Sequence, residues 1–262
     1  FRMLQSSGVA LEPKPFAVDL RVEHPQGLID RIQYGPSAGH PRLPPAEYQF
    51  TYRDSRGRAV YSFCMCPGGS VIAASSENQG LATNGMSLFR RNSPFANSAL
   101  VVSVGIEDFG GTGPFAGMEF QRRWEEMAYR LGGGNFRAPA QGVLDFLQNR
   151  APSALRETSF KPGITPARLD ECLPAFVLES LREALPQFNR KMPGFISSEA
   201  VFIGIETRTS CPLRLSRNKD YQSQSVRGLY PIGEGSGYAG GIISSALDGW
   251  KAAEAVSKKL NE

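Results

Sequence analysis

The strongest constraint on this chain is a glycine-rich segment close to its C-terminus. Residues 228–242 read GLYPIGEGSGYAGGI, and Gly235, Gly237 and Gly240 fit the spacing G-x-G-x-x-G. The apolar run 229–232 predicts a strand before the glycines, and the sequence after them predicts a helix. Glycines let a backbone approach an anionic ligand closely, and a helix start offers free N–H groups. The segment therefore predicts a binding site for a phosphate-bearing ligand.

This motif is too close to the chain end to begin a complete dinucleotide-binding domain. Such a domain needs a helix, a second strand and an acidic residue about 20 positions after the glycines. Only 22 residues follow Gly240, and one helix uses them. We therefore expect the segment to complete a site whose other half is supplied elsewhere. A simpler reading stays open, in which the glycines serve a tight turn and helix packing only.

The rest of the pattern predicts an α+β fold. A strand is expected at residues 16–23, with Asp19, Arg21 and Glu23 on a wet face. Asp54 begins a predicted hairpin turn. Further strands or short extended pieces are expected at 48–52, 59–66, 71–74, 99–104, 201–205, 212–215 and 229–232. Helices are expected at 120–131 and 143–147, after an N-cap at Thr165 followed by Pro166, after Pro174, and at 240–260.

Composition excludes several classes of function. The 29 basic and 25 acidic side chains are scattered and leave a net charge of +4, which argues against nucleic acid as a partner. No apolar run has the length of a membrane span, and no signal peptide is visible. Four cysteines without a CxxC spacing indicate a reducing cytoplasm and predict no metal site. The chain starts at Phe1 inside what reads as a helix end, so we interpret it as a piece of a longer protein.

Eight short stretches carry a resemblance together that none of them carries alone. They are PFAVDLRVEHPQ (15–26), YSFCMCPGG (61–69), TNGM (83–86), ANSALVV (96–102), EFQRRW (119–124), APAQ (138–141), ETRTSCPLRL (206–215) and residues 228–242. With these stretches the chain resembles the uncharacterised FAD-dependent dehydrogenases of bacteria, which are NAD(P)/FAD-dependent oxidoreductases. Residues 228–242 resemble the last FAD-contacting motif of flavoproteins with two dinucleotide-binding domains.

The resemblance implies a division of the chain and a cofactor site. Residues 1–9 would end a helix of the FAD domain, and residues 10–225 would form an inserted substrate domain with a mixed or antiparallel sheet. Residues 226–262 would supply the last strand and helix of the FAD fold, whose first glycine loop would lie upstream of Phe1. The implied FAD-binding residues are Gly233, Glu234, Gly237, Tyr238, Ala239, Gly240, Gly241 and Ile242. A carboxylate at Glu234 would accept a sugar hydroxyl of the cofactor, unless it is an exposed turn residue.

Catalytic residues are not identified by the sequence, which leaves four candidates. Cys64 and Cys66 would face the flavin, or else serve as small buried hydrophobic residues. On a regular strand they point to one face about 6.5–7 Å apart, so we expect no disulfide between them. Arg208 and Arg214 would hold an anionic substrate or the reduced flavin ring, or be structural.

Three further positions have open readings. Residues 84–85 (Asn-Gly) predict a tight turn, whether an ordinary one or one that lines a pocket. His24 is either a general base or a satisfied residue at a strand end. Cys211 replaces the serine expected in such a stretch, which leaves no specific polar role for this side chain.

We therefore expect the C-terminal part of a flavin-dependent oxidoreductase. FAD would pass a hydride between a small-molecule substrate and NAD(P)H or another acceptor. The alternative is a non-enzymatic binding module that uses the glycine-rich helix start for a phosphate-bearing ligand. A self-contained NAD(P) enzyme is disfavoured by the length of chain after the glycines.

Overall fold

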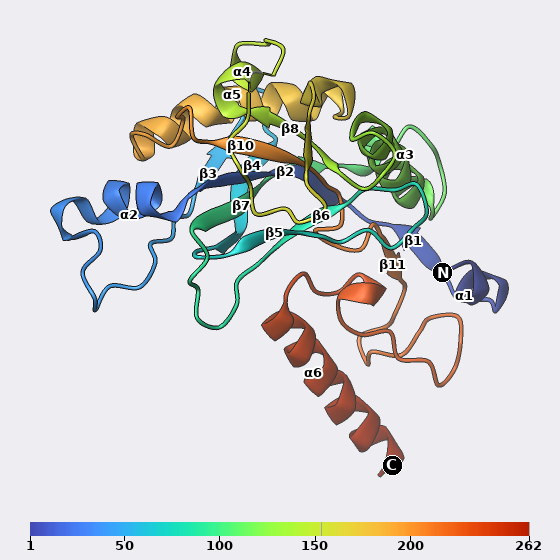
Figure 1. The fold of residues 1–262 in the computed structure, drawn as a ribbon. Coiled ribbons are helices and arrows are strands. Elements are labelled where there is room, and N and C mark those ends of the chain that lie inside the picture. The colour runs from blue at the N-terminus through green and yellow to red at the C-terminus, as the bar shows by residue number, and fades with distance from the viewer. Residues whose placement is uncertain (153, 262) are drawn as a thin grey trace. The chain divides into compact units, whose positions relative to one another are not determined.

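The computed structural model describes residues 1–152 and 154–261, which form two compact units (Figure 1). The first unit contains Phe1–Ala17, Val104–Gln121 and Arg208–Glu262, apart from the last residue. The second contains Val18–Ser103 and Arg122–Thr207. Each unit is therefore assembled from segments that lie far apart in the sequence.

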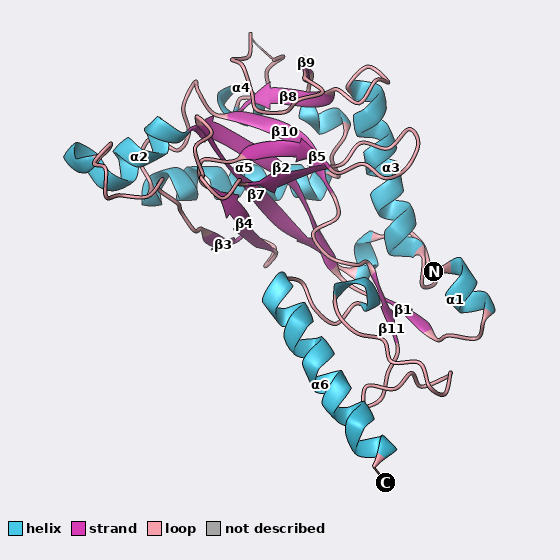
Figure 2. Ribbon diagram, turned by 60° about the horizontal axis from the view of Figure 1, so that its bottom comes forward, coloured by secondary structure: helices cyan, strands magenta, loops and turns pink. Residues whose placement is uncertain are grey.

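The second unit is built on a seven-stranded mixed sheet. The sheet strands are β2 (Phe16–Pro25), β3 (Thr51–Arg53), β4 (Ala59–Cys66), β7 (Phe95–Val104), β8 (Ala138–Gly142), β9 (Ile164–Pro166) and β10 (Val201–Glu206). Their order is β3-β4-β7-β2-β10-β8-β9, and Figure 2 shows these strands side by side. β8 and β9 run parallel, whereas β3–β4, β4–β7, β2–β10 and β8–β10 are antiparallel. The α+β class with a mixed sheet is thus confirmed.

Helices and a two-stranded ribbon pack on this sheet. The remaining elements of the unit are α2 (Gln26–Tyr34), β5 (Ser70–Ala73), β6 (Thr83–Met86), most of α3 (Ala116–Leu131), α4 (Val143–Leu147) and α5 (Ala175–Lys191). α5 lies against β3 and β4, where Phe188 stacks on Phe50 with ring centroids 4.8 Å apart. The antiparallel β5–β6 ribbon lies against β4 and β10 through β6. Thr83 anchors the ribbon, because its hydroxyl donates to the backbone oxygen of Ile205.

Strand β2 is buried on both faces, so the predicted wet face is wrong. Asp19, Arg21 and Glu23 are all fully buried, as are Leu20 and Val22. Leu20 lies against Gly204 of β10, whereas Arg21 lies against Gly85 of the ribbon. The alternation of polar and apolar residues is real, but the ribbon and its neighbouring segments cover the polar face.

The first unit contains fewer regular elements. They are α1 (Arg2–Ser6), β1 (Leu11–Pro13), β11 (Leu213–Leu215), the start of α3 and α6 (Ile242–Leu260), with turns of 3₁₀ helix at Ile106–Asp108 and Glu234–Ser236. β1 and β11 pair antiparallel, with Glu12 opposite Arg214. A small core of Val9, Leu213 and Leu215 lies beneath this pair. The helix end expected near Phe1 and the closing helix are both present.

Two predicted elements differ in the structure. Thr165 and Pro166 belong to strand β9 at the sheet edge instead of starting a helix. An edge strand tolerates proline, because one side of it needs no backbone donor. Residues 229–232 form no strand, since no backbone of the described chain runs alongside them in a ladder. The expected helix after Pro174 is α5, which begins at Ala175.

Candidate functional site

The most elaborate polar arrangement in the second unit surrounds Arg21 at the centre of the sheet. Its guanidinium group binds both carboxylate oxygens of Glu206, one of them at 3.0 Å. It also donates to the backbone oxygen of Cys64 at 2.9 Å and to the side-chain oxygens of Asn84 at 3.0 Å and Asn97 at 3.2 Å. We call these five residues, together with Asp19, the Arg21 cluster. A buried arginine needs this many acceptors, because an unpaired buried charge is very costly.

The glycine of the TNGM stretch is required by this cluster. A Cβ atom at Gly85 would lie 2.2 Å from Nη1 of Arg21 and 2.5 Å from Oδ1 of Asn97. Asn84 and Gly85 lie inside strand β6, paired with Ile72 and Val71, so the predicted tight turn is wrong. The Asn-Gly pair serves instead to place an amide oxygen on the guanidinium and to leave room for it.

Five of the resembling stretches meet at the Arg21 cluster. Each contributes from a different strand: Arg21 from β2, Cys64 from β4, Asn84 from β6, Asn97 from β7 and Glu206 from β10. Sequence reasoning missed this convergence. The available signal was that charged or amide side chains stand among apolar residues at Arg21, Asn97 and Glu206, which predicts hydrogen-bond partners for them if these strands are buried.

Two carboxyl groups of the cluster compete for one guanidinium charge. Burial, and then the nearby Glu206, raise the pKa of Asp19 well above its usual range. Burial also raises the pKa of Glu206, although Arg21 opposes this change. Burial by itself lowers the pKa of Arg21, but the Glu206 carboxylate outweighs it and the net change is a rise. We therefore describe Glu206 as the ionised partner of Arg21 and Asp19 as the protonated acid.

The protonated state of Asp19 agrees with its surroundings. No donor from the described residues reaches either carboxyl oxygen of Asp19. A hydrogen bond between Asp19 and Glu206 consequently needs a proton on one of the two carboxyl groups. The raised pKa of Asp19 thus favours its protonated form beside the buried Arg21–Glu206 ion pair.

Cys64 and Cys66 lie at the edge of the cluster, where β4 is irregular. The register with β7 shifts between Phe63 and Cys66, and Cys64 has a left-handed φ of 46°. Cys64 is exposed and Cys66 is buried, and the ladder is shifted between them, so the expectation of a regular strand here was wrong. Both thiols are free.

The glycine-rich segment in the first unit forms a loop stabilised from α6. The N–H of Gly233 donates to Asp248 at 2.8 Å, and the Asp248 carboxylate also binds both terminal nitrogens of Arg217. The Arg217 guanidinium lies 3.6 Å from the ring centroid of Tyr238. Sequence reasoning missed Arg217 and Asp248, since they are 31 positions apart and belong to no shared motif.

The glycines of this loop have different local roles. Gly237 has a left-handed φ of 86°, and a Cβ atom there would lie 2.5 Å from the backbone oxygen of Leu213. Gly235 and Gly240 face open space, and Gly241 precedes the first turn of α6 in an extended conformation. Glu234 is exposed in the 3₁₀ turn. The loop therefore leaves its backbone open at two glycines beside a helix start.

Two of the other predicted residues of this unit, Arg214 and Cys211, contact the loop backbone. Arg214 donates to the backbone oxygen of Gly237 at 3.3 Å, and its guanidinium lies 5.1 Å from the Tyr238 ring centroid. Cys211 contacts the backbone oxygen of Gly235 at 3.5 Å, and burial raises the pKa of its thiol. Arg208 is half-buried before this group, while Ala239 and Ile242 flank the last two glycines.

Residues 15–209 match the family described as "FAD-dependent protein, C-terminal domain-like". The chain belongs to this family. It is also 49% identical over 264 residues to a protein of Clostridium beijerinckii named only as an uncharacterized protein. That alignment covers 100% of the chain and 50% of the relative, so the chain spans about half the length of the curated relative it matches.

Family membership associates the chain with FAD. Only one of the two candidate regions lies within the range that matches the family. The matched range of the FAD-dependent family contains the whole Arg21 cluster and both Cys64 and Cys66. The glycine-rich loop and α6 lie after this range. Within the loop, Gly235 and Gly240 leave backbone open, which is a surface that an anionic ligand can approach.

His24 does not act as an exposed base in this family member. Its Nε2 atom lies 2.8 Å from the backbone oxygen of Phe195, and its ring packs 4.8 Å from the Phe195 ring. Burial lowers the pKa of His24 to about 4. The imidazole is therefore neutral at physiological pH, and its Nε2 is paired as the strand-end reading expects, whereas its Nδ1 has no partner among the described residues.

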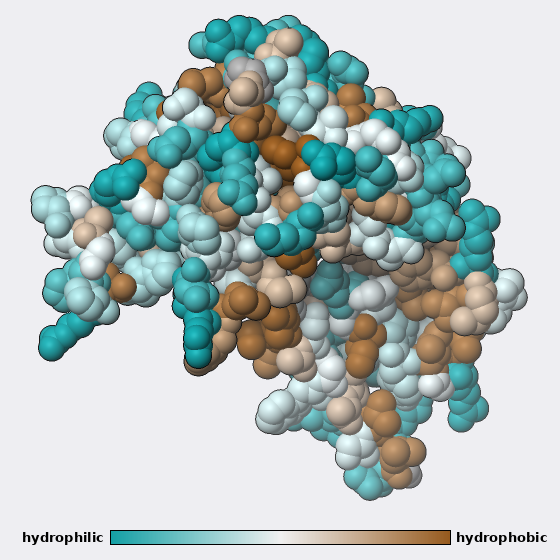
Figure 3. Space-filling view, in the orientation of Figure 1, coloured by the Kyte–Doolittle hydropathy of each residue, from teal (hydrophilic) through white to brown (hydrophobic). Residues whose placement is uncertain are grey.

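α6 presents large apolar side chains at the surface of the first unit. Ile242 is 89% exposed and Trp250 68% exposed, and Ile243 and Leu247 are exposed as well. Figure 3 shows hydrophobic surface over the helix that Figure 1 labels α6. Ala252 is the one fully buried residue among those described in this helix. No helix of the described residues has the length and apolar character to cross a membrane.

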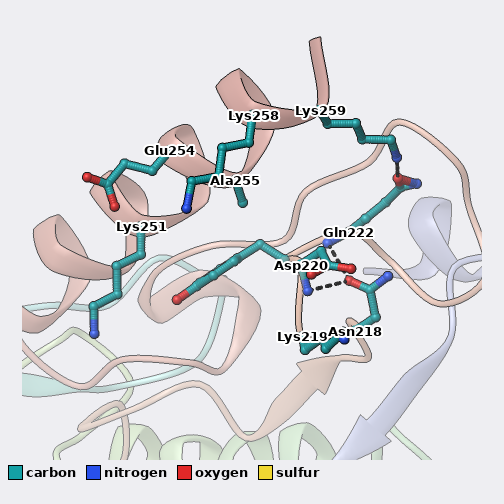
Figure 4. Close-up of a pocket in the computed structure, with 10 residues that line it drawn as sticks. Asn218, Lys219, Asp220, Gln222, Lys251, Glu254, Ala255, Lys258 and Lys259 are labelled. Atoms are coloured by element: carbon teal, nitrogen blue, oxygen red, sulfur yellow. Dashed lines mark hydrogen bonds between the residues drawn. The ribbon is translucent and has the colours of Figure 1, made fainter. Parts of the chain in front are cut away.

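A basic hollow of about 560 Å³ lies on the same helix (Figure 4). Its charged lining consists of Lys219, Lys251, Lys258 and Lys259 together with Asp220 and Glu254. Lys259 binds the side chain of Gln222 across the hollow. Since the acidic residues offset half of the lysine charge, the hollow is a weakly cationic surface, and we assign it no ligand.

Proposed function

We propose that this chain is the C-terminal part of an FAD-dependent oxidoreductase related to the uncharacterised FAD-dependent dehydrogenases of bacteria. The observation that carries the proposal is the glycine-rich loop at the start of α6, in a chain of an FAD-dependent family. Open backbone at Gly235 and Gly240 beside a helix N-terminus suits an anionic cofactor. The parent protein would be an enzyme of the cytoplasm, a location supported by four free thiols.

The proposed cofactor site is one edge of the loop. Gly233, Glu234 and residues 237–242 would hold FAD, with the Glu234 carboxylate accepting a sugar hydroxyl. The first N–H groups of α6 would face negative charge on the cofactor, and Arg214 would add a positive charge beside Gly237. FAD itself would supply the hydride chemistry, and NAD(P)H or another acceptor would exchange electrons with it.

The apolar surface of α6 supports a division in which this helix completes the FAD domain. Exposed Ile242, Ile243, Leu247 and Trp250 are unusual for a solvated helix. The longer relative contains about as much additional chain as this one supplies. We propose that residues 1–9 and 226–262 pack on that additional part, where 229–232 would pair as a strand, and that residues 10–225 form the substrate domain.

Flavin content of this chain and of the full-length protein tests the proposal. We expect the full-length protein to purify with bound FAD and the chain of 262 residues to purify nearly colourless. Losing about 5 kcal/mol of contacts to adenosine and pyrophosphate weakens binding more than a thousandfold, at about 1.4 kcal/mol per tenfold. Absorbance at the flavin band, normalised to protein, and FAD titration of both proteins measure this difference.

The same measurement separates the proposal from a binding module. A full-length protein without flavin that binds phosphate-bearing ligands at the loop would favour the module. Stoichiometric flavin on the isolated chain would show that the site is complete within it, which contradicts the proposed division. Flavin in the full-length protein, lost after a change in the loop, supports the oxidoreductase.

A further inference from the structure

The two cysteines at the end of β4 have distinct environments and lie within reach of each other. We propose that Cys64 and Cys66 form a redox-active dithiol, in which Cys64 attacks a hydroperoxide and Cys66 then resolves the oxidised Cys64 into a disulfide. This inference goes beyond the proposed function, because it rests on the second unit alone and needs no flavin.

The backbone at Cys64 brings the thiols together. Two residues on a regular strand are about 6.5–7 Å apart, at or beyond disulfide reach. Here the register with β7 shifts between Phe63 and Cys66, and Cys64 turns to a left-handed φ of 46°. The Cys66 thiol consequently lies 3.3 Å from the backbone oxygen of Cys64, and Cys66 is the neighbour that most lowers the pKa of the Cys64 thiol. The pair is therefore reduced in this structure but arranged for contact.

The turn after Cys66 fixes this arrangement. A Cβ atom at Gly68 would lie 1.8 Å from the backbone oxygen of Arg91, and one at Gly69 would lie 2.9 Å from Cβ of Cys66. The N–H of Gly68 donates to Gln26 at 2.7 Å. Larger residues at Gly68 and Gly69 would therefore displace the turn that follows the buried Cys66.

Access distinguishes the two thiols. Cys64 is exposed and lines an open hollow of about 540 Å³, together with Gln33, Gln49 and Met65. Cys66 is only 5% exposed. An oxidant from solvent therefore meets Cys64 first, and Cys66 is placed as the second thiol.

Electrostatics gives the thiols opposite protonation states. The hydrogen bond from Cys66, and the Arg21 charge acting against burial, lower the pKa of Cys64 to about 5. The hydrogen bond with Cys64 and burial raise the pKa of Cys66. The other titratable groups that interact electrostatically with Cys64 are Asp19 and Glu206, and Arg21 donates to the backbone oxygen of Cys64. At neutral pH Cys64 is thus a thiolate beside a neutral Cys66 thiol, as a nucleophile and a resolving thiol require.

The reaction balances with a hydroperoxide as oxidant. The Cys64 thiolate attacks one peroxide oxygen, the O–O bond breaks, and the leaving oxygen takes a proton from solvent as water or alcohol. Cys66 then attacks the sulfur of the Cys64 sulfenic acid, the S–O bond breaks, and water leaves with the Cys66 proton. The two sulfurs lose two electrons, which the peroxide gains, and an added dithiol reverses the change.

Oxidation of the native chain by hydrogen peroxide, followed by peptide mass spectrometry, tests the proposal. We expect one disulfide between Cys64 and Cys66, while Cys172 and Cys211 stay reduced as internal controls. Cys66→Ser should stop at a sulfenic acid on Cys64 that a dimedone probe traps. In Cys64→Ser, Cys66 should remain a thiol. Oxidation of Cys66 in that variant, or a wild-type Cys64 that stays reduced while Cys211 reacts, overturns the proposal.

Alkylation rates give a second readout that does not depend on peroxide. Thiolate fraction changes tenfold per pH unit below a thiol pKa, so from about pH 5.5 to about pH 8.5 the Cys64 rate should change less than about twofold. The Cys211 rate should rise on the order of a thousandfold over the same interval. Cys66→Ala should make the Cys64 rate climb with pH, because the hydrogen-bond donor is gone. Parallel wild-type profiles for Cys64 and Cys211 contradict the assigned roles.

Discussion

The Arg21 cluster and the glycine-rich loop both combine arginine, carboxylate and glycine residues, but the first region is largely buried and the second is partly exposed. Every nitrogen of the Arg21 guanidinium donates to an acceptor, and Arg21 and Asn97 fill the space that a Cβ atom of Gly85 would need. At the loop, Gly235 and Gly240 face open space, and the helix that follows exposes Ile242 and Trp250. The Arg21 guanidinium is fully paired within the chain, although the Asp19 carboxyl oxygens and Asn97 Nδ2 have no partner among the described residues, whereas the second region leaves backbone and apolar side chains exposed.

This difference teaches how to interpret glycine in a motif. Gly85 is a glycine because a neighbouring side chain occupies the space of its Cβ atom. Gly237 is a glycine because its φ is left-handed and backbone lies against it. Gly235 satisfies neither condition within the chain, so its reason must lie in a ligand, or it has none. Substitutions at these positions therefore test function and packing separately.

Removing the Arg21 charge should give the largest loss of stability. Arg21→Met leaves the Glu206 carboxylate buried without its partner, and breaking a buried pair in this way costs about 3–5 kcal/mol. The free energy of unfolding from urea titration at neutral pH measures the loss. Arg56→Met is the matched control, since Arg56 pairs with Glu179 at an exposed site worth about 0–1 kcal/mol. Equal losses in the two variants would show that the cluster is not internally satisfied.

Adding one methyl group should separate the two regions next. Gly85→Ala places a Cβ atom 2.2 Å from Arg21 Nη1, and overpacking of this kind costs about 1–3 kcal/mol. Gly235→Ala meets no atom within 4 Å, so its unfolding free energy should stay within about 0.5 kcal/mol of the parent. Urea titration of both variants compares them directly. A destabilised Gly235→Ala chain would mean that the loop is packed for its own stability.

The sequence predicted the positions of most strands and helices, but it did not predict which of their polar side chains are buried. Strands at 59–66 and 201–205, the hairpin between β3 and β4, and the helices at 120–131 and 143–147 all follow from periodicity and turn residues. The burial of Asp19, Arg21 and Glu23 could not follow, because alternation shows two faces of a strand but not what covers the polar one. That covering comes from β6, whose Asn84-Gly85 resembles a turn when read alone.

Each candidate site likewise has features that the sequence predicted and features that only the structure shows. Local composition predicted the glycine loop and the helix after it, and the closeness of Arg214 to this loop appears only in three dimensions. At Cys64, strand periodicity predicted a regular geometry, and a one-residue irregularity in the ladder changed it. A bulge of this kind depends on the neighbouring strand, so the sequence of β4 alone does not reveal it.

The protonation of Asp19 predicts a pH-dependent effect of smaller size. Because the pKa of Asp19 is raised in the folded state, its contribution to stability is fully present below the ordinary value of 3.8 and is lost as pH rises through the folded pKa. Asp19→Asn removes this titration, so the variant should gain on the parent as pH rises, by at most about 1.4 kcal/mol per pH unit. Urea titrations in mildly acidic and neutral buffer measure the gap. A gap independent of pH would mean that Asp19 is ionised throughout, as an ordinary surface carboxylate is.

The smallest expected effect is the most specific to the loop. Gly241 has an extended φ, and a Cβ atom there meets only Ser244 Oγ at 3.7 Å, so Gly241→Leu should leave the chain's unfolding free energy nearly unchanged. In the full-length protein the same side chain should push the flavin away from the start of α6. We therefore expect weaker FAD binding and a lower potential for the flavin that remains.

The size of the potential shift follows from the helix end. Free N–H groups at a helix start stabilise negative charge by about 0.3–1 kcal/mol when exposed and up to about 2 kcal/mol when partly buried. For a two-electron couple, about 1 kcal/mol corresponds to roughly 20 mV. Spectroelectrochemical titration of the full-length protein measures the shift, with Lys258→Ala, far along the same helix, as the control. Because Gly241→Leu should not change the stability of the chain, any effect on flavin reports on cofactor binding. Full flavin content with an unshifted potential would place the cofactor away from this helix and would mean that the glycines serve packing only.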